Sequence, residues 1–400
     1  MDKRERAILI LSSSGHFLTH LAVGFFPGVI EPIRLEFALN FAEAAHLSFP
    51  GYLAFGLCAL PIGFLAKRVS ARTLILLGQI GIALCALGAA TSGTADELMY
   101  WMLGIGVSAS IYHPVGYALL SNSVRARGKA HGYQGVFGNL GIALAPLLGG
   151  AFSHWFSWQT AFLALGGVAC LSTLVGALFP FDERVVEPES THQRTKTDSK
   201  NARRALLFML ACAVTCAGIA YRGTELLLPK HLGDWVFGGA EGDPSANLKG
   251  TTLASITLLF ASLGQIVGGR LADKIPLALG YLLFHGLSLP FLIGLAYLYG
   301  APLPLCAALY GFFALGMQPF ENSLVARLVP VRWRSVGYGV KFVLTFGVGA
   351  LSVEYVGFLT HQSGTTASGF AGLIPFVLMI IAFAFMLHWK DRDLAKEAEE

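Results

Sequence analysis

Two histidines four residues apart stand out among the side chains that could do chemistry. His16 and His20 lie in one apolar stretch, and on a helix they share a face. Imidazole titrates near neutral pH, so this pair is a candidate for carrying a proton. Histidines at this spacing also chelate metals, and His113 is a third candidate ligand, but no carboxylate accompanies the pair at metal-ligand spacing. Proton coupling or substrate contact, structural hydrogen bonding and metal binding all stay open.

Two pairs of opposite charges lie in later apolar stretches. Arg222 and Glu225 are three residues apart, a spacing that brings them to one helix face. Arg222 is the best candidate to hold an anionic substrate or to neutralise Glu225, which would then release its proton. Glu321 and Lys341 form a similar candidate couple, with Glu321 as a second proton carrier. The alternative for each pair is a static ion pair that locks its helix.

Several weaker polar residues are candidates to line a substrate pocket. They are Tyr112, Tyr117, Gln134, Asn139 and Gln318. Membrane helices also use such groups for packing, so each is individually a weak signal. Glu31 and Glu354 fall nearer the ends of apolar stretches, where water can reach them, and Glu31 is at most related to a gate.

The elements that carry these residues are predicted to be membrane helices. Only 13% of the 400 residues are charged and the mean hydropathy is +0.62, whereas a soluble domain has about 25% charged residues. This composition excludes a soluble, disordered or nucleic-acid-binding protein. Apolar stretches of about 20 residues predict twelve transmembrane helices, at 7–31, 45–66, 73–92, 98–122, 130–152, 158–179, 205–229, 251–271, 277–298, 302–326, 336–359 and 367–388.

The distribution of cations predicts the topology. With the N-terminus inside, 23 of the 28 Lys and Arg fall in cytoplasmic segments, as the positive-inside rule requires. Both termini are therefore expected in the cytoplasm. The polar stretch 181–204 reads as a cytoplasmic linker between a six-helix bundle at 1–180 and a second bundle, with a short tail, at 205–400.

The two halves repeat each other weakly. Gly63 to Arg68 corresponds to Gly269 to Lys274, 206 residues later, and His113-Pro114 corresponds to Gln318-Pro319, 205 residues later. A repeat of six spans predicts two pseudo-symmetric bundles with a binding site between them.

These motifs resemble the major facilitator superfamily. Its signature after spans two and eight, Gly-x-x-x-Asp-Arg/Lys, fits Gly269, Asp273 and Lys274, whereas the first copy has Lys67 in the Asp position. The resemblance implies an inner gate that regulates the conformational cycle and is looser in the N-terminal half. A span-five signature common in exporters appears as Gly141, Ala145, Pro146, Gly149 and Gly150. Candidate gating residues are Gly63, Arg68, Arg72, Pro146, Gly269, Asp273 and Lys274.

A narrower resemblance is to the fosmidomycin-resistance type of efflux transporter. The matching stretches are Gly15 to His20, Tyr112-His113-Pro114 and Gly138 to Gly141 with Pro146. In that fold span four approaches span one, which would bring His113 near His16 and His20. Members usually have Asp where this chain has His20, and Glu and Arg where it has Val115 and Ala118, so substrate and coupling ion stay open.

The function that these features favour is proton-coupled export of a small organic compound, anionic or drug-like, by alternating access. Such a protein would work as a monomer in a bacterial inner membrane, with substrate and protons as partners and no cofactor. No Walker loop or hydrolytic constellation indicates an enzyme. Two alternatives remain: a transporter of a metal ion or chelate that uses His16, His20 and His113, and a membrane sensor or scaffold that transports nothing.

Overall fold

The computed structural model describes residues 2–125, 127–183, 200–238, 243–330 and 333–397. Within these residues every regular element is helical, and twelve helical segments are long and apolar enough to cross a membrane. The predicted all-α membrane fold with twelve spans is therefore confirmed. Because lipid offers no hydrogen-bond partners, helices that satisfy their own backbone are the expected solution for such a chain.

The N-terminal half is the group of helices up to residue 178. Its elements are α1 (Lys3–Val23), α2 (Phe26–Glu36), α3 (Phe41–His46), α4 (Phe49–Leu57), α5 (Ala59–Leu65), α6 (Ala71–Ala90), α7 (Ala95–Ala109), α8 (Tyr112–Ser123), α9 (Arg127–Trp155) and α10 (Trp158–Leu178).

The C-terminal half begins at residue 200. Its elements are α11 (Lys200–Phe237), α12 (Pro244–Ala272), α13 (Leu277–Tyr297), α14 (Pro302–Gly316), α15 (Gln318–Leu328), α16 (Arg334–Phe342), the π-helical segment η2 (Val343–Val348), α17 (Leu351–Ser363) and α18 (Thr366–Glu397).

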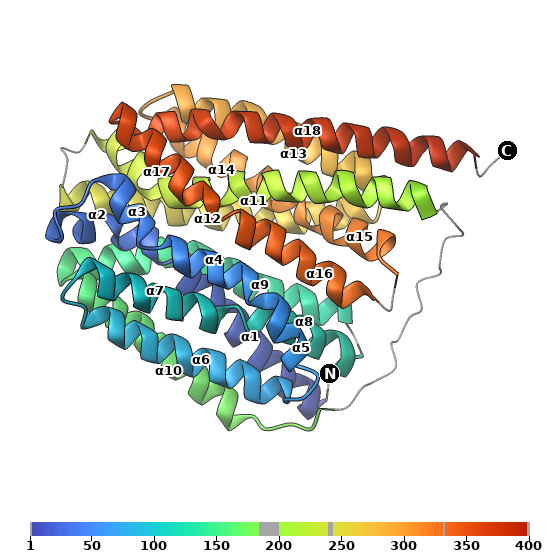
Figure 1. Ribbon diagram of the computed structural model, residues 1–400, viewed down its shortest axis with the longest axis horizontal. Helices are drawn as coiled ribbons and strands as arrows, with labels where there is room; N and C mark the ends of the chain where they lie inside the picture. The colour runs from blue at the N-terminus through green and yellow to red at the C-terminus, as the bar shows by residue number, and fades with distance from the viewer. Residues whose placement is uncertain (1, 126, 184–199, 239–242, 331–332, 398–400) are drawn as a thin grey trace.

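The two halves lie side by side, and the helices of both run roughly along the long axis of the molecule. In Figure 1 the N-terminal half occupies the lower part and the C-terminal half the upper part, and the start of α1 and the end of α18 lie toward the same end. Helices α9 and α12 pack against each other where the halves meet, as do α4 and η2, and α3 and α17. The contact surface between the halves is therefore built by a few helices from each.

Several spans are interrupted rather than continuous, and the interruptions place candidate residues. The fourth span breaks between α7 and α8, and the tenth breaks between α14 and α15. His113-Pro114 and Gln318-Pro319 lie at the starts of α8 and α15, where proline's missing N–H is tolerated. The sequence repeat at these dipeptides thus corresponds to a similar break in each half.

The predicted bounds need correction at the membrane surfaces. Residues 200–204, assigned to the linker, are the first turn of α11, and the segment between the predicted spans 205–229 and 251–271 is helical up to Phe237 and again from Pro244. A span predicted from hydropathy ends at the first polar residues. The helix itself can continue into water as long as its backbone hydrogen bonds are made. Residues 184–199 of the predicted linker lie outside the described residues.

Candidate functional site

Three histidines meet in the N-terminal half. His16 and His20 are contributed by α1 and His113 by α8, and one ring nitrogen from each lies within 4.8 Å of those of the other two. The Nε2 atoms of His16 and His20 are 3.1 Å apart. The sequence expectation that the three approach one another holds in the structure. They form what we call the histidine cluster.

A hydrogen-bond network fixes one side of the histidine cluster. The Nδ1 atom of His16 lies 2.8 Å from the backbone carbonyl oxygen of Gln134. The Gln134 side-chain amide donates to the Tyr112 hydroxyl at 3.0 Å, and that hydroxyl is 2.8 Å from the hydroxyl of Ser12. Tyr112 and Gln134, predicted as pocket-lining residues, are buried and bonded to neighbours, so they orient His16 rather than face an open space.

Aromatic rings cover the other side of the cluster. The His113 ring stacks on Phe342 and Phe346, with centroids 5.0 and 5.7 Å away. These two residues lie in α16 and η2 of the C-terminal half, and short π-helical segments are frequent at functional sites. Tyr117 stacks on His131 with centroids 5.5 Å apart and reaches the edge of this group, 5.9 Å from His113. The cluster is thus closed by rings that belong to the other half.

The Arg222–Glu225 pair lies between the two halves. The Arg222 guanidinium forms an ion pair with the Glu225 carboxylate on α11, and it lies over the ring of Tyr52 on α4, 4.1 Å from the centroid. Arg222 is only 2% exposed. Glu225 in turn approaches Gly24 at the end of α1, where a Cβ would lie 3.0 Å from its Oε1 atom. This pair therefore touches two helices of the N-terminal half.

The second pair, Glu321 and Lys341, has its hydrogen-bond partners in the C-terminal half, although the Lys341 charge also acts on His113 of the other half. The Lys341 Nζ atom is 2.8 Å from the Oε1 atom of Glu321 and also donates to the Asn322 side chain at 2.5 Å. The Tyr281 hydroxyl donates to the other carboxylate oxygen at 3.0 Å. Both charged side chains are less than a tenth exposed. Each charge thus has its counter-charge and further hydrogen bonds, as burial requires.

Asn139 and Gln318 are joined through a residue that the sequence analysis missed. The Asn139 side-chain amide on α9 donates to Gln265 on α12 at 2.9 Å, and Gln265 donates to Gln318 on α15 at 2.7 Å. This chain of amides crosses from one half to the other. Gln265 lies within the predicted span 251–271. A polar residue inside a span is the sequence signal that could have identified it.

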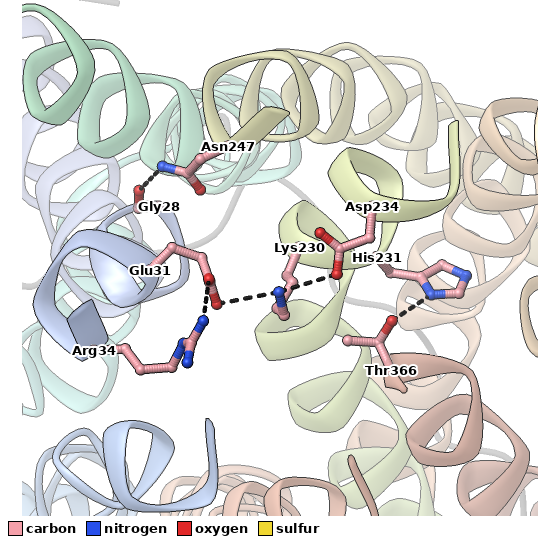
Figure 2. Close-up of polar contacts among 8 residues, drawn as sticks. All are labelled: Gly28, Glu31, Arg34, Lys230, His231, Asp234, Asn247 and Thr366. Carbon is pink, nitrogen blue, oxygen red and sulfur yellow. Dashed lines mark hydrogen bonds and ion pairs between the residues drawn. The ribbon is translucent and has the colours of Figure 1, made fainter. Parts of the chain in front are cut away.

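A third charged group closes the end of the molecule opposite the termini. Glu31 on α2 accepts from Arg34 at 3.2 Å, and Lys230 on α11 is 3.4 Å from Glu31 and 3.0 Å from Asp234. Figure 2 shows Lys230 between the two carboxylates, so that the network joins α2 to α11. We call these four residues the outer network, after the side on which the distribution of cations predicts this end to lie. Three of them, Glu31, Lys230 and Asp234, line a small pocket together with His154, Asp243 and Asn247.

Glu31 is less accessible than its position near a span end suggests, because this side chain is 8% exposed and lies beside two cations. Glu354 does remain accessible, with 42% of its side chain exposed, and pairs with His46 of α3 at 2.7 Å. Beside the outer network, Asp243 is the N-cap of α12 and accepts a hydrogen bond from the backbone N–H of Ser245. This bond holds the pKa of the Asp243 carboxyl below its usual range.

The predicted gating residues separate into two groups. Pro146 packs against Gly28, where a Cβ would meet the Pro146 carbonyl oxygen at 2.7 Å, so that the span-five signature brings α2 and α9 together. The remaining group, at the end of the molecule that bears the termini, consists of Gly63, Arg68, Arg72, Gly269, Asp273 and Lys274. Within this group, Arg72 donates to the Ala177 carbonyl at 3.0 Å. Asp273 has no ion pair with another described residue.

Comparisons with known proteins agree with this architecture. A profile of the Major Facilitator Superfamily matches residues 13–353. The uncharacterized MFS-type transporter YwoD of Bacillus subtilis is 28% identical over 46% of this chain and 41% of its own. The methyl viologen resistance protein SmvA of Salmonella typhimurium is 31% identical over 26% of this chain and 22% of its own. The chain thus matches less than half of the length of either relative.

Among solved structures, the fold resembles that of a bacterial homolog of the human lysosomal transporter Spinster, in an inward-facing and unoccupied conformation. The TM-score is 0.76 at 15% identity, over 99% of this chain and 98% of that one. At this identity the similarity shows the fold alone.

Proposed function

The chain belongs to the Major Facilitator Superfamily, and from this premise we propose that it exports a small, drug-like organic compound in exchange for protons. It is a multi-pass membrane transporter rather than an enzyme, as its family and relatives indicate. The resistance function in the name of SmvA supports export. Substrate, proton coupling, monomeric state and location in a bacterial inner membrane with cytoplasmic termini are parts of the proposal.

The observation that carries the proposal is the position of Arg222 and Glu225. Both side chains are less than a tenth exposed, yet they contact Tyr52 and Gly24 of the opposite half. Ionisable groups are expensive inside a membrane and usually mark substrate or proton pathways. A charge pair that spans the contact between the halves is positioned to sense whether they are closed or parted.

Glu225 is the group for which substrate and proton would compete. In an exchanger, substrate and proton must compete for one group, so that binding of one releases the other. A carboxylate fits this requirement if the substrate presents a positive charge or a hydrogen-bond donor. Arg222 is neutralised by Glu225, so an anion would have to displace Glu225 to reach it. Protonation of the displaced carboxylate would then move proton and anion together, which is the opposite of exchange.

We assign the proton to Glu225 rather than to the histidines predicted from the sequence. His16 is held by the Gln134 carbonyl and by His20, and the cluster has no described carboxylate within its group. Glu321 is a secondary candidate. It bonds to Lys341 and Tyr281, and Lys341 also bonds to Asn322, so all of these hydrogen bonds stay within one half. Its main role in the proposal is to hold α15 against α16.

The outer network supplies one gate of the proposed cycle. Lys230 joins Glu31 across the halves, so these contacts must break when the protein opens at that end. Asn139, Gln265 and Gln318 would line the path of the substrate at the contact between α9, α12 and α15. The predicted inner group around Asp273 and Lys274 would gate the other end.

The test uses everted membrane vesicles that contain the protein, with an acidic lumen. We expect methyl viologen, a dication, to accumulate in the lumen as protons leave, and Glu225→Gln to abolish the dependence on the pH gradient. Glu354→Gln is the matched control, since Glu354 is an exposed carboxylate at the outer end. Fosmidomycin, a phosphonate, is the opposing probe.

Three outcomes would count against the proposal. Accumulation of methyl viologen that ignores the pH gradient would remove proton exchange. Movement of fosmidomycin together with protons would replace the exchange by co-transport through Arg222. No flux of either compound, or of a wider panel of drug-like cations, would remove drug export.

A further inference from the structure

The histidine cluster has donor atoms spaced for a metal ion. The Nε2 atoms of His16 and His20 are 3.1 Å apart. In a tetrahedral zinc site with Zn–N bonds of about 2.0–2.1 Å, two ligand nitrogens are about 3.3 Å apart. Two of the three ligands thus already span one edge of such a site. The third, from His113, lies within 4.8 Å of both and would have to approach by about 1.5 Å to complete the face.

The tautomer of His16 is the one that a metal ligand needs. Its Nδ1 atom faces the Gln134 carbonyl oxygen at 2.8 Å, and a carbonyl only accepts. Nδ1 therefore carries the hydrogen, and the lone pair of Nε2 points at His20. Metal-binding histidines characteristically donate their second nitrogen to a carbonyl or carboxylate in this way. Gly138 on α9 allows the arrangement, because a Cβ at that position would collide with the His16 ring.

His113 supplies an independent indication that a ligand is missing. It is 4% exposed, and neither of its ring nitrogens has a hydrogen-bond partner among the described residues. A buried polar atom without a partner is destabilising, so such atoms usually meet a ligand, an ion or water. Its ring stacks on Phe342, and Phe55 lies tilted beside it. These apolar rings offer neither nitrogen of His113 a hydrogen bond.

We propose that His16, His20 and His113 bind a first-row transition-metal ion such as Zn²⁺. Imidazole nitrogens suit zinc, copper and nickel, and three histidines leave a fourth position open for water or an anion. All three ligands belong to α1 and α8 of one half, while Phe342 and Phe346 come from the other. Movement of the halves would uncover the site without dismantling it, so the metal is a resident that joins α1 to α8.

This site does not depend on the proposed export function, since neither Glu225 nor Glu321 is among its ligands. The metal and the exchanged proton would occupy different groups. Failure of one proposal therefore leaves the other standing, provided that metal binding is measured directly rather than through transport.

The experiment titrates the purified full-length protein with Zn²⁺ by calorimetry and with Co²⁺ by visible absorption. We expect one metal per chain and the intense bands of tetrahedral Co²⁺. His113→Ala and His20→Ala should each weaken binding at least tenfold. Gly138→Ala keeps all three ligands but displaces the His16 ring, so it should weaken binding as well. His231→Ala and His285→Ala, two buried histidines of the C-terminal half, are matched controls and should bind normally.

Binding data overturn the proposal if the wild-type protein takes up no stoichiometric Zn²⁺, or if the two ligand variants bind as well as wild type. Equal loss in His285→Ala would show that the effect is general damage. His20 is the least buried of the three, so His20→Ala is the variant that keeps the test decisive if His113→Ala does not fold. Methyl viologen flux measured with excess EDTA reports separately on export.

Discussion

The two halves of this transporter solve the problem of polar groups inside a membrane in different ways. The N-terminal half places three imidazoles together and gives them no counter-charge within their group. The C-terminal half places two acid–base pairs, Arg222–Glu225 and Glu321–Lys341, whose charges cancel locally. A neutral cluster can gain a charged ligand without breaking an ion pair, whereas a paired carboxylate can accept a proton only by weakening its pair. The halves are thus suited to hold different cargo or ligands.

The two pairs of the C-terminal half also differ from each other. Arg222–Glu225 contacts Tyr52 and Gly24 of the opposite half, whereas Glu321–Lys341 is satisfied by Asn322 and Tyr281 of its own half. A pair whose surroundings change when the halves part can couple chemistry to movement. A pair whose hydrogen bonds all stay within one half mainly stabilises that half. Variants of each pair should therefore affect transport and stability differently.

Arg222→Ala is expected to have the largest effect, because it leaves Glu225 buried without its partner. Breaking a buried ion pair costs about 3–5 kcal/mol, and transport should fall by about 100-fold or more, at about 1.4 kcal/mol for each factor of ten. Flux of methyl viologen into everted vesicles measures it. The double variant Arg222→Ala/Glu225→Ala, which leaves no orphaned charge, should recover stability but not transport. Wild-type flux in the single variant would remove Arg222 from the site.

Glu225→Gln and Glu321→Gln should separate the two pairs. We expect Glu225→Gln to abolish the response of transport to a pH gradient, because the shared carboxylate is gone. Glu321→Gln should retain that response, with flux lowered about threefold. Its folded state should be destabilised by about 3–5 kcal/mol, because the buried charge of Lys341 loses its partner, and a lower thermal transition measures this. The two assays are run on the same vesicles and the same purified proteins. A reversed order of effects would mean that the enclosed pair carries the proton.

Lys230→Met tests whether the outer network acts as a gate. Its loss removes the bridge from α11 to Glu31 but leaves Glu31 paired with Arg34. We expect the outer end to open more readily, which faster hydrogen exchange in α2 and in the outer part of α11 would show. Flux should change about two- to threefold, which corresponds to about 0.5 kcal/mol. Arg34→Met, which keeps the bridge between halves, is the control. Unchanged exchange in Lys230→Met would mean that the network is only structural.

The sequence predicts some of these features because they depend on local spacing. Apolar runs of span length and the placement of Lys and Arg determine the twelve helices, and the three-residue spacing of Arg222 and Glu225 predicts their pairing. The approach of His113 to His16 and His20 followed from a resemblance to a known fold rather than from spacing.

The partners from the opposite half could not be predicted in the same way. Tyr52 beneath Arg222, Gln265 between Asn139 and Gln318, and Lys230 beside Glu31 all depend on which helix faces meet. Hydropathy does not encode that choice in a membrane, because lipid-facing and protein-facing sides are both apolar. For the same reason the position of Glu31 near a span end did not predict that its side chain would be only 8% exposed.

The smallest effect is expected at His46 and Glu354, another ion pair between the halves at the outer end. This pair joins α3 to α17 at 2.7 Å, but its side chains are 51% and 42% exposed. Exposed ion pairs contribute about 0–1 kcal/mol, so His46→Ala should change the thermal transition little and leave methyl viologen flux and its pH response unchanged. Comparison of His46→Ala with Lys230→Met shows whether the effect depends on burial of the charges or only on their position between the halves. If the exposed pair matters as much as the enclosed network, then contact between the halves, rather than burial of the charges, controls the outer end.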